Sequence, residues 1–135
     1  MIEVVLDTET TGLSVSEGHR IVEIGCIEIK DLIPTKKTFH CYLNPERKVS
    51  EQAFKVHGYS DSFLSKQKKF NEIVDDFLKF IDGKRLVIHN AEFDISHLNH
   101  ELTLLGKEKI KQEVIDTVKI ARDKFPGSNI SLDAL

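Results

Sequence analysis

The sequence predicts an α/β fold built on a mixed five-stranded sheet flanked by helices. Residues 1–43 contain three strand-like stretches joined by short connections, which predicts an antiparallel meander. Residues 70–124 then alternate helix-like and strand-like stretches, which predicts parallel crossovers. The first strand-like stretch also ends in two carboxylates, Asp7 and Glu9, and this places polar chemistry at the edge of a buried sheet.

Residues 4–6 (VVL) form an apolar run that predicts a buried strand ending at the carboxylates. Residues 21–29 (IVEIGCIEI) and 38–43 (TFHCYL) are rich in residues that favour strands. Gly18 and residues 31–34 (DLIP) supply the breaks before and between these two stretches.

Residues 70–81 are the clearest helix in the sequence. Their apolar residues recur with helical spacing on one face, and Gly83 ends the pattern: Phe70, Ile73, Val74, Phe77, Leu78 and Ile81. A shorter helix is predicted over residues 50–56, with Ser50 as its N-cap.

Residues 85–89 (RLVIH) predict a short buried strand, and residues 94–105 a second amphipathic helix closed by Gly106. The buried face of that helix is expected to carry Ile95, Leu98, Leu102 and Leu105. Residues 114–116 predict a further strand, followed by a helix through about residue 124 that residues 126–127 (PG) end.

A chain of 135 residues with a net charge of −3 is expected to form one domain, residues 1–135, with a single core. The apolar runs are too short for a membrane span, and no signal peptide is recognisable, so a cytoplasmic protein without membrane contact is expected. Cys26 and Cys41 lack metal-binding spacing and are expected to be reduced core thiols. The lysine clusters predict solvated faces rather than a long groove for nucleic acid.

Asp7 and Glu9 lie two residues apart, so in a strand they point to the same face. Asp94 opens the second amphipathic helix at the edge of its apolar stripe and is expected to lean toward the sheet. If the two strands are neighbours, three carboxylates converge on one point, which suits hard divalent cations such as Mg²⁺ or Mn²⁺. The residues alone leave an alternative open, in which these acids cap a turn and a helix N-terminus.

The motifs LDTETTGL (residues 6–13) and VIHNAEFDISHLNHEL (residues 87–102) resemble the first two exonuclease motifs of the DEDDh family of 3′→5′ exonucleases. That resemblance implies a ribonuclease H-like exonuclease fold. Residues 39–64 and 115–135 are similar, more narrowly, to the proofreading epsilon-subunit branch of that family, which serves bacterial DNA polymerase III.

The resemblance implies roles for individual residues. Asp7, Glu9 and Asp94 would be catalytic and would ligate two divalent cations, with Asp7 bridging both. The expected contacts to the terminal nucleotide are Thr8, Thr10, Gln52 and His57, although Gln52 stands where this branch typically has a glutamate. His89 and Asn90 are expected to shape the strand-to-helix turn.

The family's third motif is HxxxxD on a C-terminal helix, where the histidine serves as general base. The chain's one HxxxxD pair is His89 with Asp94, which already belongs to the second motif. His97 and His100 are expected to face solvent. The domain is therefore expected to be truncated before this motif, without the family's last helix and without the polymerase-binding tail.

The resemblance implies a proofreading 3′→5′ exonuclease that releases mononucleotides from a single-stranded or frayed DNA 3′ end. The catalytic subunit of DNA polymerase III is the partner it implies. Three alternatives stay open: a weak or inactive module that binds metal, nucleic acid or a polymerase subunit; an RNA-trimming exonuclease; and an unrelated α/β protein.

Overall fold

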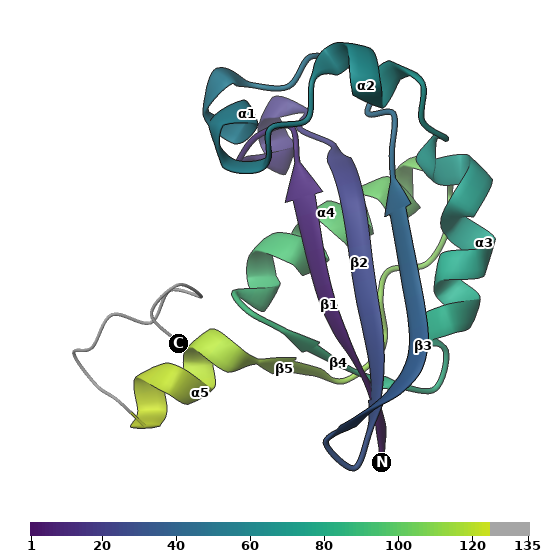
Figure 1. Cartoon of the computed structure of the whole chain (residues 1–135), viewed down its shortest axis with the longest axis vertical. Coiled ribbons are helices and arrows are strands. Elements are labelled where there is room, and N and C mark those ends of the chain that lie inside the picture. The colour runs from purple at the N-terminus through teal and green to yellow at the C-terminus, as the bar shows by residue number, and fades with distance from the viewer. Residues whose placement is uncertain (125–135) are drawn as a thin grey trace.

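The computed structural model describes residues 1–124, which form five strands with helices on one face and at one end (Figure 1). The strands are β1 (Ile2–Thr10), β2 (Ile21–Lys30), β3 (Ile33–Tyr42), β4 (Arg85–Ile88) and β5 (Val114–Asp116). The helices are the 3₁₀ turn η1 (Val15–Glu17), α1 (Glu51–His57), α2 (Asp61–Ser65), α3 (Phe70–Ile81), α4 (Ala91–Leu104) and α5 (Thr117–Lys124). Within this part of the chain, no helix has the length and apolar character needed to cross a membrane.

The sheet has the order β3-β2-β1-β4-β5, so β1 is its central strand. β1 pairs antiparallel with β2, and β2 with β3, whereas β4 runs parallel to β1 and β5 parallel to β4. An antiparallel meander followed by parallel crossovers is the predicted arrangement, and the structure confirms it.

α3 and α4 cover one face of the sheet, behind the strands in Figure 1. α3 buries the apolar face that its sequence predicts, and only Leu78 of that face remains partly accessible. These side chains share one core with Val4 and Leu6 of β1 and with Leu98 and Leu102 of α4. Burial of this apolar area is the main force holding the helices on the sheet.

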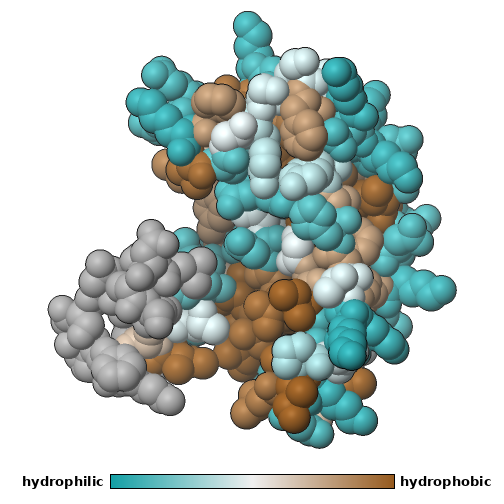
Figure 2. Space-filling view, viewed as in Figure 1, coloured by the Kyte–Doolittle hydropathy of each residue, from teal (hydrophilic) through white to brown (hydrophobic). Residues whose placement is uncertain are grey.

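The opposite face carries a row of residues that crosses all five strands and is apolar on four of them, with Thr38 on β3. Directly paired residues share a face, and the pairing gives the row Thr38, Ile27, Val5, Val87 and Ile115. Val5 is 40% exposed and Ile27 47% exposed. Figure 2 shows hydrophobic side chains gathered on the lower part of this face.

β3 begins earlier than the sequence predicts. The turn before it is made by Asp31 and Leu32, which have positive φ angles of 51° and 70°. Pro34, expected to break the chain, instead lies inside β3. The expectation was wrong because β3 is an edge strand, where a proline that cannot donate a hydrogen bond is tolerated.

α4 begins at Ala91, after a two-residue turn from β4, rather than at residue 94. Leu105, expected on the buried face, lies after the helix end and is 39% exposed. Gly106 does close the helix, with a φ of 70°. The short elements η1 and α2 were missed because three and five residues are too few to show a helical period.

His97 does not face solvent, so that expectation was wrong: the residue is 1% exposed. α4 contacts η1 as well as β2, β4 and β5, and therefore buries a wider face than a helix lying on a sheet alone. His97 Nδ1 donates to the Phe93 carbonyl at 2.8 Å. His100 is half-buried.

Cys26 is buried, Cys41 is partly buried, and both are free thiols. Burial raises the pKa of Cys26 to about 12 and that of Cys41 to about 11. Thiols with such pKa values are unreactive near neutral pH, as expected for core cysteines. The predicted end of the last helix, at residues 126–127, lies outside the described residues.

Candidate active site

The carboxyl end of β1 places acidic side chains on one face of the sheet. Asp7 and Glu9 alternate along the strand with Thr8 and Thr10, which point to the other face. Glu9 pairs across the sheet with Glu23 of β2. Because cross-strand partners share a face, Asp7, Glu9 and Glu23 form one acidic group.

Asp94, in the first turn of α4, reaches the same end of β1. The residue is 3% exposed, so the prediction that it leans toward the sheet is confirmed. Thr8 donates its hydroxyl to Asp94 Oδ1. This bond joins the start of α4 to the central strand, beside the two carboxylates of β1.

The pKa values of all three carboxyl groups are raised. Burial is the largest cause for each, and the pKa of Asp94 reaches about 7 through all its causes together. The charges of Asp7 and Glu9 raise the pKa of Asp94 further, against the opposing hydrogen bond from Thr8. Nearby positive charge would therefore favour the ionised form of the whole group.

The donor set of these residues suits hard divalent cations, because it consists of carboxylate oxygens. The predicted convergence on one point is found only in part, however. Among the described residues, no three His, Cys, Asp or Glu side chains are arranged as a formed metal site. The Asp94 carboxylate instead accepts a hydrogen bond from Thr8, whose side chain lies on the opposite face of β1 from Asp7 and Glu9.

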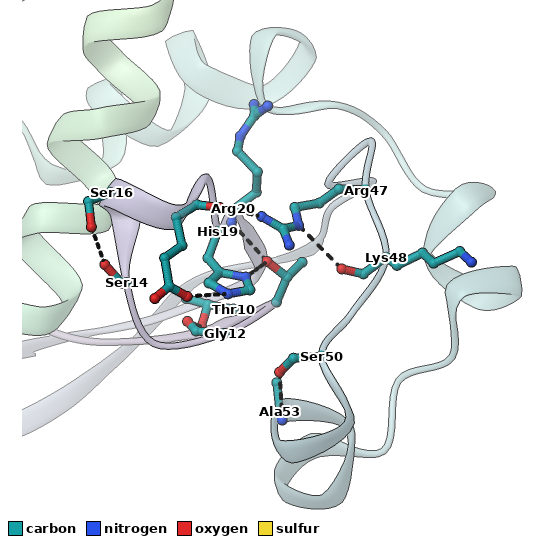
Figure 3. Close-up of polar contacts among 12 residues, drawn as sticks. Thr10, Gly12, Ser14, Ser16, His19, Arg20, Arg47, Lys48, Ser50 and Ala53 are labelled. Carbon is teal, nitrogen blue, oxygen red and sulfur yellow. Dashed lines mark hydrogen bonds and ion pairs between the residues drawn. The ribbon is translucent and has the colours of Figure 1, made fainter.

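A cavity of about 490 Å³ opens beside Glu9. Its walls come from the loop after β1, from α1 and from Phe93 of α4. Figure 3 shows Thr10, Gly12 and His19 on the loop side, and Ser50 with Ala53 at the start of α1. Ser50 caps α1 by accepting from the Ala53 N–H at 3.1 Å, as the sequence predicts. A cavity of this size accommodates a small-molecule ligand.

Three of the four residues expected to contact a nucleotide line this cavity: Thr10, Gln52 and His57. The Thr10 hydroxyl donates to the Gly12 carbonyl at 2.6 Å, which shapes the loop. Thr8 does not line the cavity, since its side chain is buried and bonded to Asp94.

The orientation of His57 is determined by two hydrogen bonds. Its Nδ1 accepts from the Tyr59 N–H at 3.0 Å, so Nε2 carries the proton and donates to the Thr10 carbonyl at 3.1 Å. Tyr59 stacks on the imidazole with a centroid distance of 4.8 Å and donates its hydroxyl to Glu23 at 2.8 Å. His57 thus ties α1 to the end of β1 while lining the cavity.

Sequence reasoning did not single out Gly12, His19 and Phe93, which also line the cavity. A Cβ atom on Gly12 would lie 2.3 Å from the His19 ring, so only glycine allows this approach. Gly12 and Phe93 lie inside the two quoted motifs, which was the available signal. Nothing local marks His19, because its contact with Gly12 arises only when the loop closes.

A mixed sheet of this order, with carboxylates at the end of its central strand and at the start of α4, defines the ribonuclease H-like class of nuclease folds. The chain belongs to the exonuclease family, because the family model described as Exonuclease matches residues 4–135. The relationship that the two motifs predict is thereby confirmed.

Among curated proteins, the chain is 53% identical over 137 residues to DNA polymerase III subunit epsilon of Rickettsia typhi, covering 98% of this chain and 60% of the relative. It is 45% identical over 141 residues to the subunit of the same name from Escherichia coli K12, covering 98% of this chain and 58% of the relative. The chain therefore spans about 60% of the length of such relatives.

Among solved structures, exonuclease X in complex with 5′ overhanging duplex DNA has a TM-score of 0.74 at 25% identity, covering 95% of this chain and 67% of that chain. The nuclease domain of 3′hExo, a DEDDh family member bound to rAMP, has a TM-score of 0.80 at 17% identity, covering 97% of this chain and 74% of that chain. The second comparison establishes the shared fold.

Proposed function

We propose that this chain carries the catalytic core of a 3′→5′ exonuclease that proofreads DNA during replication. It would hydrolyse the terminal phosphodiester of a single-stranded or frayed 3′ end and release a nucleoside monophosphate. The observation that carries the proposal is the gathering of Asp7, Glu9 and Asp94 at one end of β1, where Glu9 lines a cavity of about 490 Å³. The identity to epsilon subunits supports the choice of DNA replication.

Asp7, Glu9 and Asp94 would hold two divalent cations, Mg²⁺ or Mn²⁺. Such a pair of ions stabilises the attacking and leaving oxygens of a phosphoryl displacement. Thr8 would hold the Asp94 carboxylate in place, as its hydroxyl already contacts it. Thr10, Gln52 and His57 would position the terminal nucleotide, with the Gln52 amide able to donate to a sugar hydroxyl or a base.

The partner we propose for the whole protein is the catalytic subunit of DNA polymerase III, on the strength of the relatives' name. A DNA substrate is supported by the complex of exonuclease X with duplex DNA. The rAMP bound to 3′hExo makes RNA the alternative substrate that a test must include.

The test measures nucleotide release from 3′-labelled single-stranded DNA and RNA oligomers in the presence of Mn²⁺. Mn²⁺ binding to the protein is measured in parallel by electron paramagnetic resonance. Asp7→Asn and Asp94→Asn remove charge at nearly constant shape. Glu92→Gln is the matched control, because Glu92 shares the first turn of α4 with Asp94 but is exposed.

Release from DNA that Asp7→Asn and Asp94→Asn abolish and Glu92→Gln preserves is the expected result. Faster nucleotide release from the RNA oligomer than from the DNA oligomer would show that the function is RNA trimming and not proofreading. Mn²⁺ binding without nucleotide release would identify a binding module. The absence of both Mn²⁺ binding and nucleotide release would overturn the proposal.

A further inference from the structure

The start of α4 is held by a residue from a different strand. Asn90, its N-cap, has a left-handed conformation with φ 61° and ψ 57°, and its side chain makes no capping hydrogen bond. The first N–H groups of a helix need acceptors, which a capping side chain normally supplies. At α4 the acceptor comes from β5.

Asp116, the last residue of β5, supplies it with both carboxylate oxygens. Oδ1 accepts from the Asn90 N–H and Oδ2 from the Ala91 N–H, each at 3.1 Å. Oδ1 also accepts from the Val118 N–H at 2.9 Å, which fixes the carboxylate at the start of α5. A negative charge at this point is also favoured by the dipole of α4.

The next residue, Thr117, adds a second contact, since its Oγ1 lies 2.8 Å from His89 Nδ1. Ile88 pairs with Asp116 in the parallel register of β4 and β5. Asp116 and Thr117 therefore hold the turn from β4 into α4, residues 88–91, through side-chain hydrogen bonds. His89 and Asn90 shape this turn, in line with the expectation from the sequence.

Asp94 lies one helical turn after Asn90, so the position of the α4 start determines where its carboxylate lies. Thr8 holds that carboxylate from β1, and Asp116 holds the helix that carries it from β5. We infer that Asp116 is a positioning residue, which aligns Asp94 with Asp7 and Glu9 for divalent-cation binding without itself being a ligand. This inference rests on the proposed function and assigns Asp116 a part in it.

The test compares Mn²⁺ affinity, measured by electron paramagnetic resonance, with the free energy of unfolding. Asp116→Asn keeps one acceptor and turns the second into a donor that faces the Ala91 N–H. Residues that orient ligands of a metal site typically change affinity by about 10–100-fold, so we expect Mn²⁺ to bind at least about tenfold more weakly. kcat on single-stranded DNA should fall in parallel, while KM stays close to that of the unmodified chain.

Two controls separate positioning from a general loss of stability. Ser60→Ala removes the cap of α2, where Ser60 accepts from the Phe63 N–H at 3.0 Å, and should cost about 1 kcal/mol without changing Mn²⁺ affinity. Glu113→Gln removes a carboxylate just before β5 and should leave Mn²⁺ affinity unchanged, while loss of its exposed pair with Arg85 should cost less than about 1 kcal/mol.

Unchanged Mn²⁺ affinity in folded Asp116→Asn would overturn the inference while leaving the proposed function intact. Absence of Mn²⁺ binding in the unmodified chain would overturn both. If Asp116→Asn does not fold, Thr117→Val tests how the same turn is held, because it removes only the hydroxyl that contacts His89. Unchanged Mn²⁺ affinity in that variant would then decide against positioning.

Discussion

Arg20 and Glu101 form a two-bonded ion pair between the start of β2 and the end of α4. Arg20 Nε donates to Oε2 and Nη2 to Oε1, both at 2.7 Å, and the Glu101 side chain is 2% exposed. The Ile21 N–H also donates to this carboxylate, at 3.3 Å. The pair connects the loop that forms the cavity to the helix that carries Asp94.

Replacing only Arg20 should destabilise the fold strongly. Arg20→Met leaves a buried carboxylate without its cation, which typically costs about 3–5 kcal/mol. The double variant Arg20→Met with Glu101→Leu should recover most of that loss, because it removes the unpaired charge as well. Urea unfolding measures both, and Lys107→Met, which breaks an exposed pair with Asp75, should cost less than about 1 kcal/mol. Equal losses in the single and double variants would contradict this account.

Stability without divalent cations should depend on Asp94 in a defined pH range. Its pKa is about 7 in the folded protein against 3.8 for an aspartate free in water, so the folded state binds more protons between these values. Stability should therefore fall as the pH rises from about 4 to about 7. Asp94→Asn removes this effect and should stabilise the chain at pH 8 by up to about 4 kcal/mol, at roughly 1.4 kcal/mol for each pKa unit.

At pH 3.5 the same substitution should make little difference, because the Asp94 carboxyl is then protonated in the folded state and mostly protonated in the unfolded state. Urea unfolding in EDTA at a series of pH values measures the effect. Asp76→Asn is the control for the removal of an exposed carboxylate from the surface. If Asp94→Asn stabilised the chain equally at every pH, the stabilisation would come from packing and not from the ionisation of Asp94.

His57→Phe should loosen the wall of the cavity. The ring shape is kept, but the Thr10 carbonyl and the Tyr59 N–H lose their partners, which should cost about 1–3 kcal/mol. Binding of thymidine monophosphate, followed by NMR titration, should weaken because α1 is no longer tied to β1. His100→Phe, at a half-buried histidine that does not line the cavity, is the control and should leave nucleotide binding unchanged. Nucleotide affinity unaltered in His57→Phe would argue against this tie.

Gly12→Ala should be destabilising, since the new methyl group would lie 2.3 Å from the His19 ring. Relieving this overlap must move the ring or the loop, at a typical cost of about 1–3 kcal/mol. Gly25→Ala provides the comparison, because its nearest neighbour would lie at 4.0 Å and needs no such movement. Thermal unfolding distinguishes the two, and similar melting temperatures would show that the loop adapts freely.

Much of the architecture could be predicted because it follows from local patterns. The spacing of apolar residues in α3 gave its bounds as residues 70–81, and the alternation in β1 placed Asp7 and Glu9 on one face. Ser50 and Gly106 marked helix ends through their own backbone preferences. Each of these signals lies within a few residues of the feature that it determines.

The features that were missed depend on contacts between distant segments. Pro34 is accommodated because β3 lies at the edge of the sheet, and α4, which carries the buried His97, packs against η1 as well as against the sheet. Gly12 meets His19 only after the loop folds back on itself.

The sequence by itself determined the fold class, the family and the residues from which a site can be built. Only the tertiary structure decided how these residues meet: Asp94 bonded to Thr8, His57 held between Thr10 and Tyr59, and Asp116 at the start of α4. The physical reason is range. Backbone propensity and apolar periodicity act over a few neighbouring residues, whereas a hydrogen bond between residues 25 or 86 positions apart exists only once the sheet has brought them together.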